Sequence, residues 1–206
     1  MGRALQGRGW CRTSAGQRRQ DHPGPTQRRP MRGQWVSAMS NGMQKQFTHD
    51  DLVKIAERWL LGSKGCGFAF AELMTQSNTG EIPDALGWKG NKSILVECKT
   101  SRSDFLADKK KPFRAMPELG IGAYRYYLCP EGVITPDDLP AKWGLVWVSN
   151  RGVAKQKVGP KGKFGWENTV FYHPTRNTRN EHQMLYSALR RIHLRGAMGL
   201  IYENNF

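Results

Sequence analysis

Two short runs of the sequence decide the fold: IPDALGW at residues 82–88 and SILVECK at residues 93–99. The second run places Glu97, Cys98 and Lys99 directly after three apolar residues. Side chains of a strand alternate between the two faces of a sheet, so Glu97 and Lys99 share one face and Cys98 takes the other. We therefore expect two charged side chains at the end of a buried strand.

The residues between the two runs include Gly90-Asn91, a pair that favours a tight hairpin. If these two residues form the loop, residue i pairs with residue 181 − i, and Asp84 lies opposite Glu97. Directly paired residues have Cβ atoms about 4.5–5.5 Å apart, which is close enough for two carboxylates to hold one hard cation. A slip of one residue in the turn would destroy this pairing.

Pro83-Asp84 and, thirteen positions after the aspartate, Glu97-Cys98-Lys99 resemble the signature of the PD-(D/E)xK nuclease superfamily. The resemblance covers roughly residues 48–149 and is greatest to small bacterial and phage nuclease-like proteins and to DNA-repair relatives. It implies an α/β fold with a restriction-endonuclease-like core, in which helices flank a central mixed β-sheet in the order αβββαβ. Residues 47–158 would form this core.

The same resemblance implies a catalytic site formed by Asp84, Glu97 and Lys99. Asp84 and Glu97 would bind Mg²⁺, for which Mn²⁺ is a substitute, and the backbone carbonyl of Cys98 would add a ligand. A hard cation neutralises charge on the phosphoryl oxygens and makes water nucleophilic. Beside it, the pKa of Lys99 would fall, and Lys99 would orient or deprotonate the attacking water or stabilise the pentacovalent state. The alternative is structural: Asp84 caps a turn and Glu97 pairs with Lys99.

Acidic residues on the first helix or first strand often complete the metal site of this superfamily, and Glu57 and Glu72 are the two candidates. Residues 68–74 read as a strand in which Glu72 is the one charged residue. A charged side chain in an apolar strand is costly unless it meets a cation or another partner. We therefore assign Glu72 to the catalytic set, with a surface or ion-paired carboxylate as the alternative.

A basic segment follows Lys99. Ser101 and Asp104 predict a capping box, and Pro112 predicts the end of a helix over 101–111. We expect this helix beside the reaction centre, with its basic side chains directed at a phosphate backbone. The expected contacts with nucleic acid are Arg102, Lys109, Lys110, Lys111 and Arg114. In the alternative, the lysines only complement the partial negative charge of the last helical turn.

Hydrophobic periodicity predicts the remaining elements. Thr48 and Asp51 predict a capping box at the start of an amphipathic helix over 48–61. Strands rich in aromatic residues are expected at 123–129 and 144–148, and their aromatic side chains are interpreted as core packing in preference to a base-stacking platform. One more strand is expected at 152–158.

The C-terminal part, residues 159–206, is expected to form a basic Gly-rich loop and a helix that packs on the core. The helix is predicted over 180–195, with Asn180 as its cap and Gly196 as its stop. Arg190 points away from the apolar stripe of this helix, toward solvent or toward a phosphate.

Charge is unevenly distributed along the 206 residues, whose net charge is +15. Residues 1–46 contain eight Arg, one Lys and one Asp, and they have few apolar residues. Such a segment cannot offset its chain entropy by burial, so we expect a disordered arm that binds phosphates or has no role. The rest of the chain is also basic, and a basic body favours nucleic acid as a partner.

Other classes of protein are disfavoured. The four cysteines form no C-x-x-C pair, the five histidines lack metal-ligand spacing, and no run of 18 apolar residues occurs. The first twenty residues have no apolar segment typical of a secretory signal. We expect reduced thiols, no membrane partner, and a cytoplasmic location in a bacterium or a phage-infected cell.

The sequence therefore predicts a Mg²⁺-dependent DNA endonuclease that acts in DNA repair, recombination or phage DNA processing. One alternative is a DNA-binding protein that keeps the nuclease fold and does not cut. Another is a basic structural or partner-binding protein in which the Asp-Glu-Lys trio is coincidental. A Holliday-junction resolvase, a narrower version of the first hypothesis, would require a homodimer with two sites, which no sequence feature establishes.

Overall fold

The computed structural model describes residues 45–75, 80–161 and 169–203. Nearly all of the predicted N-terminal arm lies outside these ranges, as does the centre of the predicted basic loop, residues 162–168. Within the described ranges, no helix combines the length and the apolar character that crossing a bilayer requires.

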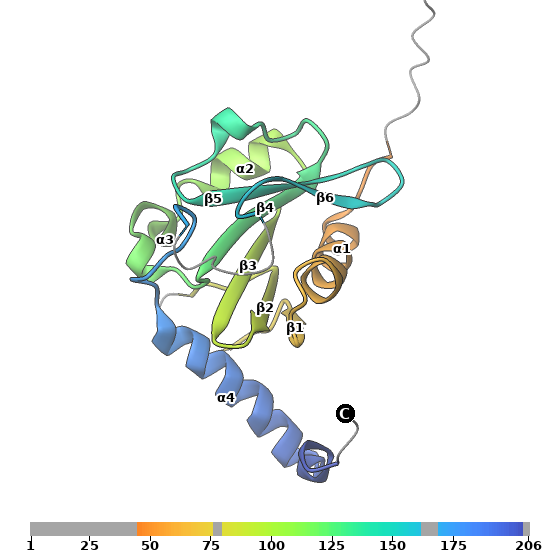
Figure 1. Ribbon diagram of the computed structural model, residues 1–206, viewed down its shortest axis with the longest axis vertical. Coiled ribbons are helices and arrows are strands. Elements are labelled where there is room, and N and C mark those ends of the chain that lie inside the picture. The colour runs from red at the N-terminus through yellow and green to blue at the C-terminus, as the bar shows by residue number, and fades with distance from the viewer. Residues whose placement is uncertain (1–44, 76–79, 162–168, 204–206) are drawn as a thin grey trace, which may run out of the picture. The chain divides into compact units, whose positions relative to one another are not determined.

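The centre of the fold is an open, mixed, six-stranded sheet whose strands are ordered as they occur in the chain (Figure 1). The pairings β3–β4 and β4–β5 are parallel, and the other three are antiparallel. The strands are β1 (Phe68–Ala71), β2 (Ala85–Lys89), β3 (Lys92–Cys98), β4 (Tyr124–Pro130), β5 (Trp143–Val148) and β6 (Ala154–Val158).

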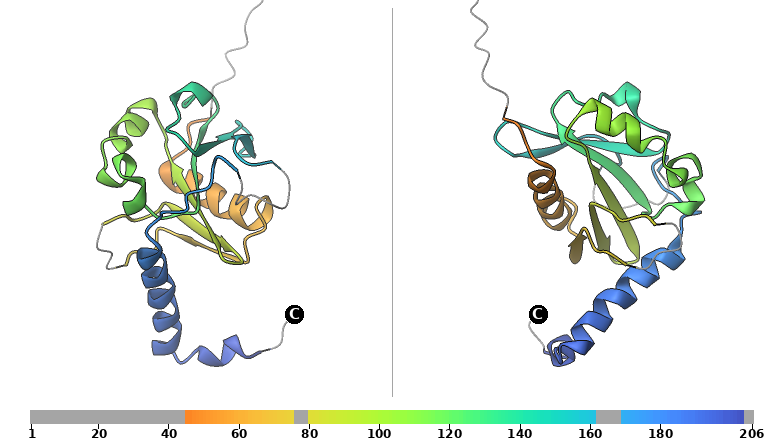
Figure 2. Two further views of the ribbon diagram at one scale, coloured as in Figure 1. Left: turned by 60° about the vertical axis from the view of Figure 1, so that its left-hand side comes forward. Right: turned by 180° about the vertical axis from the view of Figure 1, so that it is seen from behind.

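Helices cover both faces of the sheet (Figure 2). They are α1 (His49–Gly62), α2 (Arg102–Asp108), α3 (Pro112–Ala115) and α4 (Thr178–Leu194), with short 3₁₀ helices at Pro117–Leu119, Pro136–Asp138 and Met198–Ile201. The helix α1 lies on one face, and α2 and α3 lie on the other. The expected α/β class is confirmed, and the elements α1, β1 to β3, α2 and β4 follow the expected αβββαβ order, with α3 inserted before β4.

Alternation along β3 separates two cores. Ile94, Val96 and Cys98 pack with α1 in the first core, whereas Leu95 packs with Phe105 of α2 in the second. The aromatic residues of β4 are buried in these cores, which confirms the interpretation of the aromatic strands as core packing. Glu97 has the same parity as Leu95 and therefore lies on the face covered by α2 and α3.

The hairpin has the expected register. Ala85 pairs with Val96 and Lys89 with Lys92, so every pair in this ladder sums to 181. Gly90 occupies the first loop position with φ 58°, a conformation that glycine adopts without strain. The register is therefore confirmed, and it carries Asp84, the residue before β2, to the end of β3.

Helix boundaries differ from the prediction in the basic segment. Ser101 caps α2 as expected, but α2 ends at Asp108, and Pro112 begins the separate helix α3 at a position where its missing N–H is harmless. The single predicted helix over 101–111 is therefore wrong. As a consequence, Arg114 lies in α3 and not in the helix that follows Lys99.

Two other boundaries also need correction. The strand predicted over 68–74 ends at Ala71, because Glu72 has a left-handed φ of 47° and leaves the ladder. The cap of α4 is Asn177, whose side chain accepts a hydrogen bond from the N–H of Asn180. Buried residues of α4 occur only in its first two turns, so the helix packs on the core at its beginning and not along its whole length.

A glycine substitution tests the packing of β4 against β5. A Cβ at Gly144 would lie 2.4 Å from the ring of Tyr126 and 2.9 Å from the carbonyl oxygen of Val158. We expect Gly144→Ala to lower the free energy of unfolding by about 1–3 kcal/mol, as overpacking does. Gly62→Ala is the matched control, because no atom lies within 4 Å of its added Cβ. Urea denaturation that gives equal effects for the two variants would contradict this packing.

Candidate active site

Asp84 is held at the edge of the hairpin by the backbone of the neighbouring strand. Its Oδ2 accepts a 2.7 Å hydrogen bond from the N–H of Cys98. Its side chain is 17% exposed. Burial, followed by the negative charge of Glu97, raises the pKa of Asp84 to about 6. The hydrogen bond from Cys98 and the pairing of Ala85 with Val96 place Asp84 at the end of β3 that carries Glu97.

Glu97 and Lys99 lie side by side on the face covered by α2 and α3. The Nζ of Lys99 is 3.4 Å from Oε2 of Glu97 and 3.4 Å from Oδ1 of Asp108. Both side chains are almost completely buried. The second oxygen of Glu97, Oε1, is buried and has no hydrogen-bond partner among the described residues. A buried carboxylate oxygen without a partner is costly.

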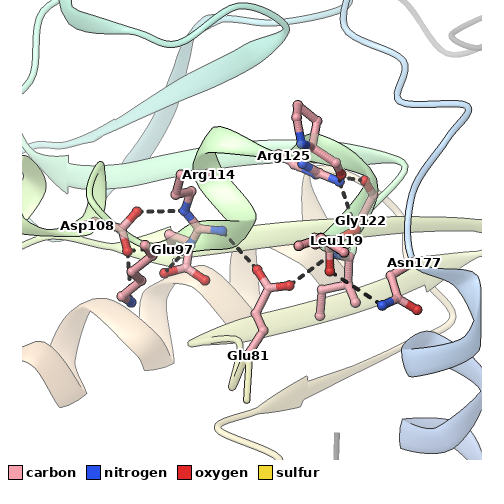
Figure 3. Close-up of polar contacts among 12 residues, drawn as sticks. Glu81, Glu97, Asp108, Arg114, Leu119, Gly122, Arg125 and Asn177 are labelled. Atoms are coloured by element: carbon pink, nitrogen blue, oxygen red, sulfur yellow. Dashed lines mark hydrogen bonds and ion pairs between the residues drawn. The ribbon is translucent and has the colours of Figure 1, made fainter. Parts of the chain in front are cut away.

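Arg114 lies at the centre of a buried network (Figure 3). Its guanidinium contacts Glu81 at 2.8 Å, Asp108 at 2.7 Å and Glu97 at 3.0 Å, and its side chain is 2% exposed. The sequence assigned Arg114 to the contacts with nucleic acid. The structure instead places it inside the protein, because three carboxylates from different segments satisfy its planar set of donors.

Two carboxylates of this network were missed in the sequence analysis. Glu81 also accepts a 3.0 Å hydrogen bond from the N–H of Ile121. Asp108 accepts a 2.9 Å hydrogen bond from the hydroxyl of Tyr127. Asp108 lies three residues after the buried Phe105 in α2, so helical periodicity could have placed it on the inward face. No local signal marks Glu81.

Several cations lie among the carboxylates of Glu81, Asp84, Glu97 and Asp108. Lys99 and Arg114 are buried with them, Arg125 is a further buried cation, and Lys111 contacts Asp108. Burial raises the pKa of Glu81 as well as that of Asp84. Buried charges are costly unless each is paired, so a cluster of this kind is an uncommon choice for the interior of a protein.

Glu72 and His49 lie at the exposed side of Asp84. The Nε2 of His49 is 3.5 Å from Oε1 of Glu72 and 3.5 Å from Oδ1 of Asp84. The N–H of Glu72 donates a 3.0 Å hydrogen bond to the carbonyl of Asp84. The structure thus brings Glu72 close to the predicted site, but as a rim residue with a side chain that is 53% exposed. His49 was missed, since a helix-start histidine carries no distinctive signal.

The other predicted basic contacts lie on the surface, and three of them have partners within the protein. Arg102 forms a bidentate pair with Asp138. Lys109 donates to the carbonyl of Asp138 at 2.9 Å, and Lys111 lies 2.8 Å from Asp108. Lys110 is exposed. Arg102, Lys109, Lys110 and Lys111 therefore remain accessible to a polyanion, whereas Arg114 does not.

A preformed cage of protein ligands is not present in the described ranges, where no group of three or more His, Cys, Asp or Glu side chains is arranged to hold a metal ion. The thiol of Cys98 faces the α1 core, and burial raises its pKa. Mg²⁺, however, is commonly held by one or two carboxylates together with water and phosphate oxygens. Asp84 and the unpartnered Oε1 of Glu97 fit that donor set.

Comparison of the chain with protein-family models, with curated proteins and with solved structures finds no match in any of the three. The interpretation of the site therefore depends on its own geometry.

Proposed function

We propose that this protein is a Mg²⁺-dependent DNA endonuclease of the PD-(D/E)xK type with a restriction-endonuclease-like core. The observation that carries the proposal is the hairpin register, which brings Asp84 to Glu97 and leaves Lys99 alongside. The αβββαβ order of elements and the basic body support the same function. We place the activity in the cytoplasm of a bacterium or phage-infected cell, in repair, recombination or phage DNA processing.

Asp84 and Glu97 would hold the metal ion, and the carbonyl of Cys98 is a further candidate ligand. When bound, Mg²⁺ would neutralise negative charge on the phosphoryl oxygens and lower the pKa of a bound water. Two features of the protein fit this role: among the described residues Oε1 of Glu97 has no hydrogen-bond partner, and Asp84 lies at the same end of β3. Glu72 at the rim is a candidate for holding an ordered water.

Lys99 is best suited to stabilise charge. Burial lowers its pKa, but Glu97, Asp108 and Asp84 together outweigh burial and raise it. The pKa of Lys99 is therefore raised in the metal-free protein, whereas a metal ion bound beside Lys99 is expected to lower it. An ammonium group that keeps its proton can donate to a phosphoryl oxygen or to the attacking water.

Arg114 and Asp108 act through the other residues. Asp108 contacts both Lys99 and Arg114, and Arg114 contacts Oε2 of Glu97, which leaves Oε1 without a partner among the described residues. These contacts restrict the rotamers of Glu97 and Lys99, which preserves the orientation of the reacting groups. We therefore assign Arg114 and Asp108 as positioning residues.

A DNA-binding protein that keeps this fold without cutting is the second candidate. The specific observation in its favour is that Lys99 and Arg114 both contact Oε2 of Glu97, so that protein cations already pair with this carboxylate. The two candidates differ in one measurable property, which is metal-dependent cleavage.

Cleavage of DNA tests the proposed function directly. We expect the parent protein to cut at least one member of a panel of supercoiled, linear, single-stranded and branched DNA in the presence of Mg²⁺ or Mn²⁺. Asp84→Asn and Lys99→Met should each reduce the rate by about 100-fold or more, as loss of a group that stabilises the transition state does. Asp137→Asn removes an exposed carboxylate and should leave the rate unchanged.

Circular dichroism would verify that the variants fold. A parent protein that binds DNA but cuts no member of the panel would favour the second candidate. A parent that cuts while Asp84→Asn and Lys99→Met cut equally well would show that the site is elsewhere.

Stability in the absence of metal provides a second test. The raised pKa of Asp84 means that the native state holds a proton between about pH 4 and pH 6 that the unfolded state has released. Ionised Asp84 therefore destabilises the native state at neutral pH. We expect Asp84→Asn to be more stable than the parent at about pH 7.5 by about 1–3 kcal/mol, with the difference vanishing near pH 4.

Thermal denaturation with and without Mg²⁺ would complete this test. The parent should gain stability from Mg²⁺, and Asp84→Asn should lose that gain. Asp137→Asn should show neither effect. If Mg²⁺ stabilises the parent and Asp84→Asn equally, Asp84 is not a ligand.

A further inference from the structure

The helix α4 is anchored at its first turns and extends from there beyond the sheet (Figures 1 and 2). Its buried residues are Asn180, Glu181 and Met184, all in the first half of the helix. Oε1 of Glu181 accepts a 2.6 Å hydrogen bond from the hydroxyl of Ser93, at the start of β3, and a 2.9 Å hydrogen bond from the N–H of Gly122. The helix therefore leaves the core in a defined direction.

One face of α4 carries a stripe of basic and aromatic side chains. The basic stripe consists of Arg179, His182, Tyr186, Arg190 and His193. Their spacings of three and four residues place them on one side of the helix, and all five are exposed. At 1.5 Å per residue, the stripe is about 21 Å long. The only acidic residue of α4 is Glu181, which is buried and paired with Arg176.

The side of α4 next to the stripe, about 110° around the helix axis from it, is apolar and faces β1. Leu185, Ala188 and Ile192 line a hollow of about 460 Å³ together with Phe68 and Phe70 of β1. The basic stripe and the apolar side therefore point in different directions. A helix lying on a membrane surface would present its apolar side to the lipid, whereas the apolar side of α4 is turned toward β1.

Exposed helices in water are commonly stabilised by pairs of opposite charge three or four residues apart. Among the described residues, α4 has no exposed carboxylate to pair with Arg179 or Arg190. The two arginines lie about 16.5 Å apart along the helix axis, a span over which duplex DNA presents several phosphates, since it carries one charge per about 1.7 Å of axis.

We propose that the basic stripe of α4 docks the phosphate backbone of duplex DNA. The inference rests on the proposed function only for the choice of DNA as the polyanion. Arg179 and Arg190 contact phosphates, and Tyr186 between them donates a hydrogen bond from its hydroxyl. The stripe supplies affinity without reading sequence, because phosphates carry no sequence information.

Binding of a fluorescent duplex of about 20 base pairs, measured by anisotropy in EDTA, tests the proposal without requiring cleavage. We expect Arg179→Gln/Arg190→Gln to weaken binding by about tenfold or more at moderate salt. The slope of log K against log salt should decrease in magnitude by about 2, because two phosphate contacts are lost. The matched control is Arg151→Gln/Lys155→Gln, which removes the same charge from exposed positions before and in β6 and should change binding less than about threefold.

Several outcomes would overturn the proposal. Equal weakening by the two double variants would show that only net charge matters. If Arg179→Gln/Arg190→Gln binds DNA as tightly as the parent, the basic stripe does not contact DNA. Binding of the parent to vesicles of anionic lipid, abolished in the α4 variant while DNA binding persists, would assign the stripe to a membrane surface. A parent that binds DNA through α4 and cuts nothing would refute the proposed function and leave this inference standing.

Discussion

The contacts of one guanidinium hold the candidate site together. Arg114 joins Glu97 at the end of β3, Asp108 at the end of α2 and Glu81 before β2, so three segments of the chain converge on a single planar donor set. A buried guanidinium is stable only while its partners are in place, and each partner is stable only while Arg114 is charged. This mutual dependence fixes α2 and α3 against the sheet and gives Glu97 one orientation.

The sequence predicted the features that depend on neighbouring residues. The hairpin register follows from Gly90-Asn91, and the start of α1 follows from Thr48 and Asp51, whose reciprocal capping is observed. The buried network could not be predicted, because Arg114 meets Glu81 across 33 residues and only the folded sheet brings them together. Glu72 was misplaced for a related reason: nothing in its neighbours reveals the left-handed backbone that removes it from β1.

The buried charges of the candidate site are costly to the stability of the fold. In other proteins, replacing a buried ion pair with apolar side chains often leaves stability unchanged or increases it. Selection for stability alone would therefore favour apolar residues in place of these charged ones. Here, a partnerless Glu97 oxygen and a carboxylate with a raised pKa persist beside an ammonium group. Functional sites are where such departures from good packing and pairing are expected. Because comparison with other proteins finds no match, the proposal of a function depends on the contacts within this site.

The topology of the sheet also has a consequence for the order in which the protein folds. The β2–β3 hairpin closes a two-residue loop, whereas the parallel pairing of β3 with β4 must wait for the intervening α2 and α3. Local contacts form on the microsecond scale, and pairings of high contact order form later. Asp84, Glu97 and Lys99 are thus brought together early in folding, and the guanidinium that restrains them arrives afterwards.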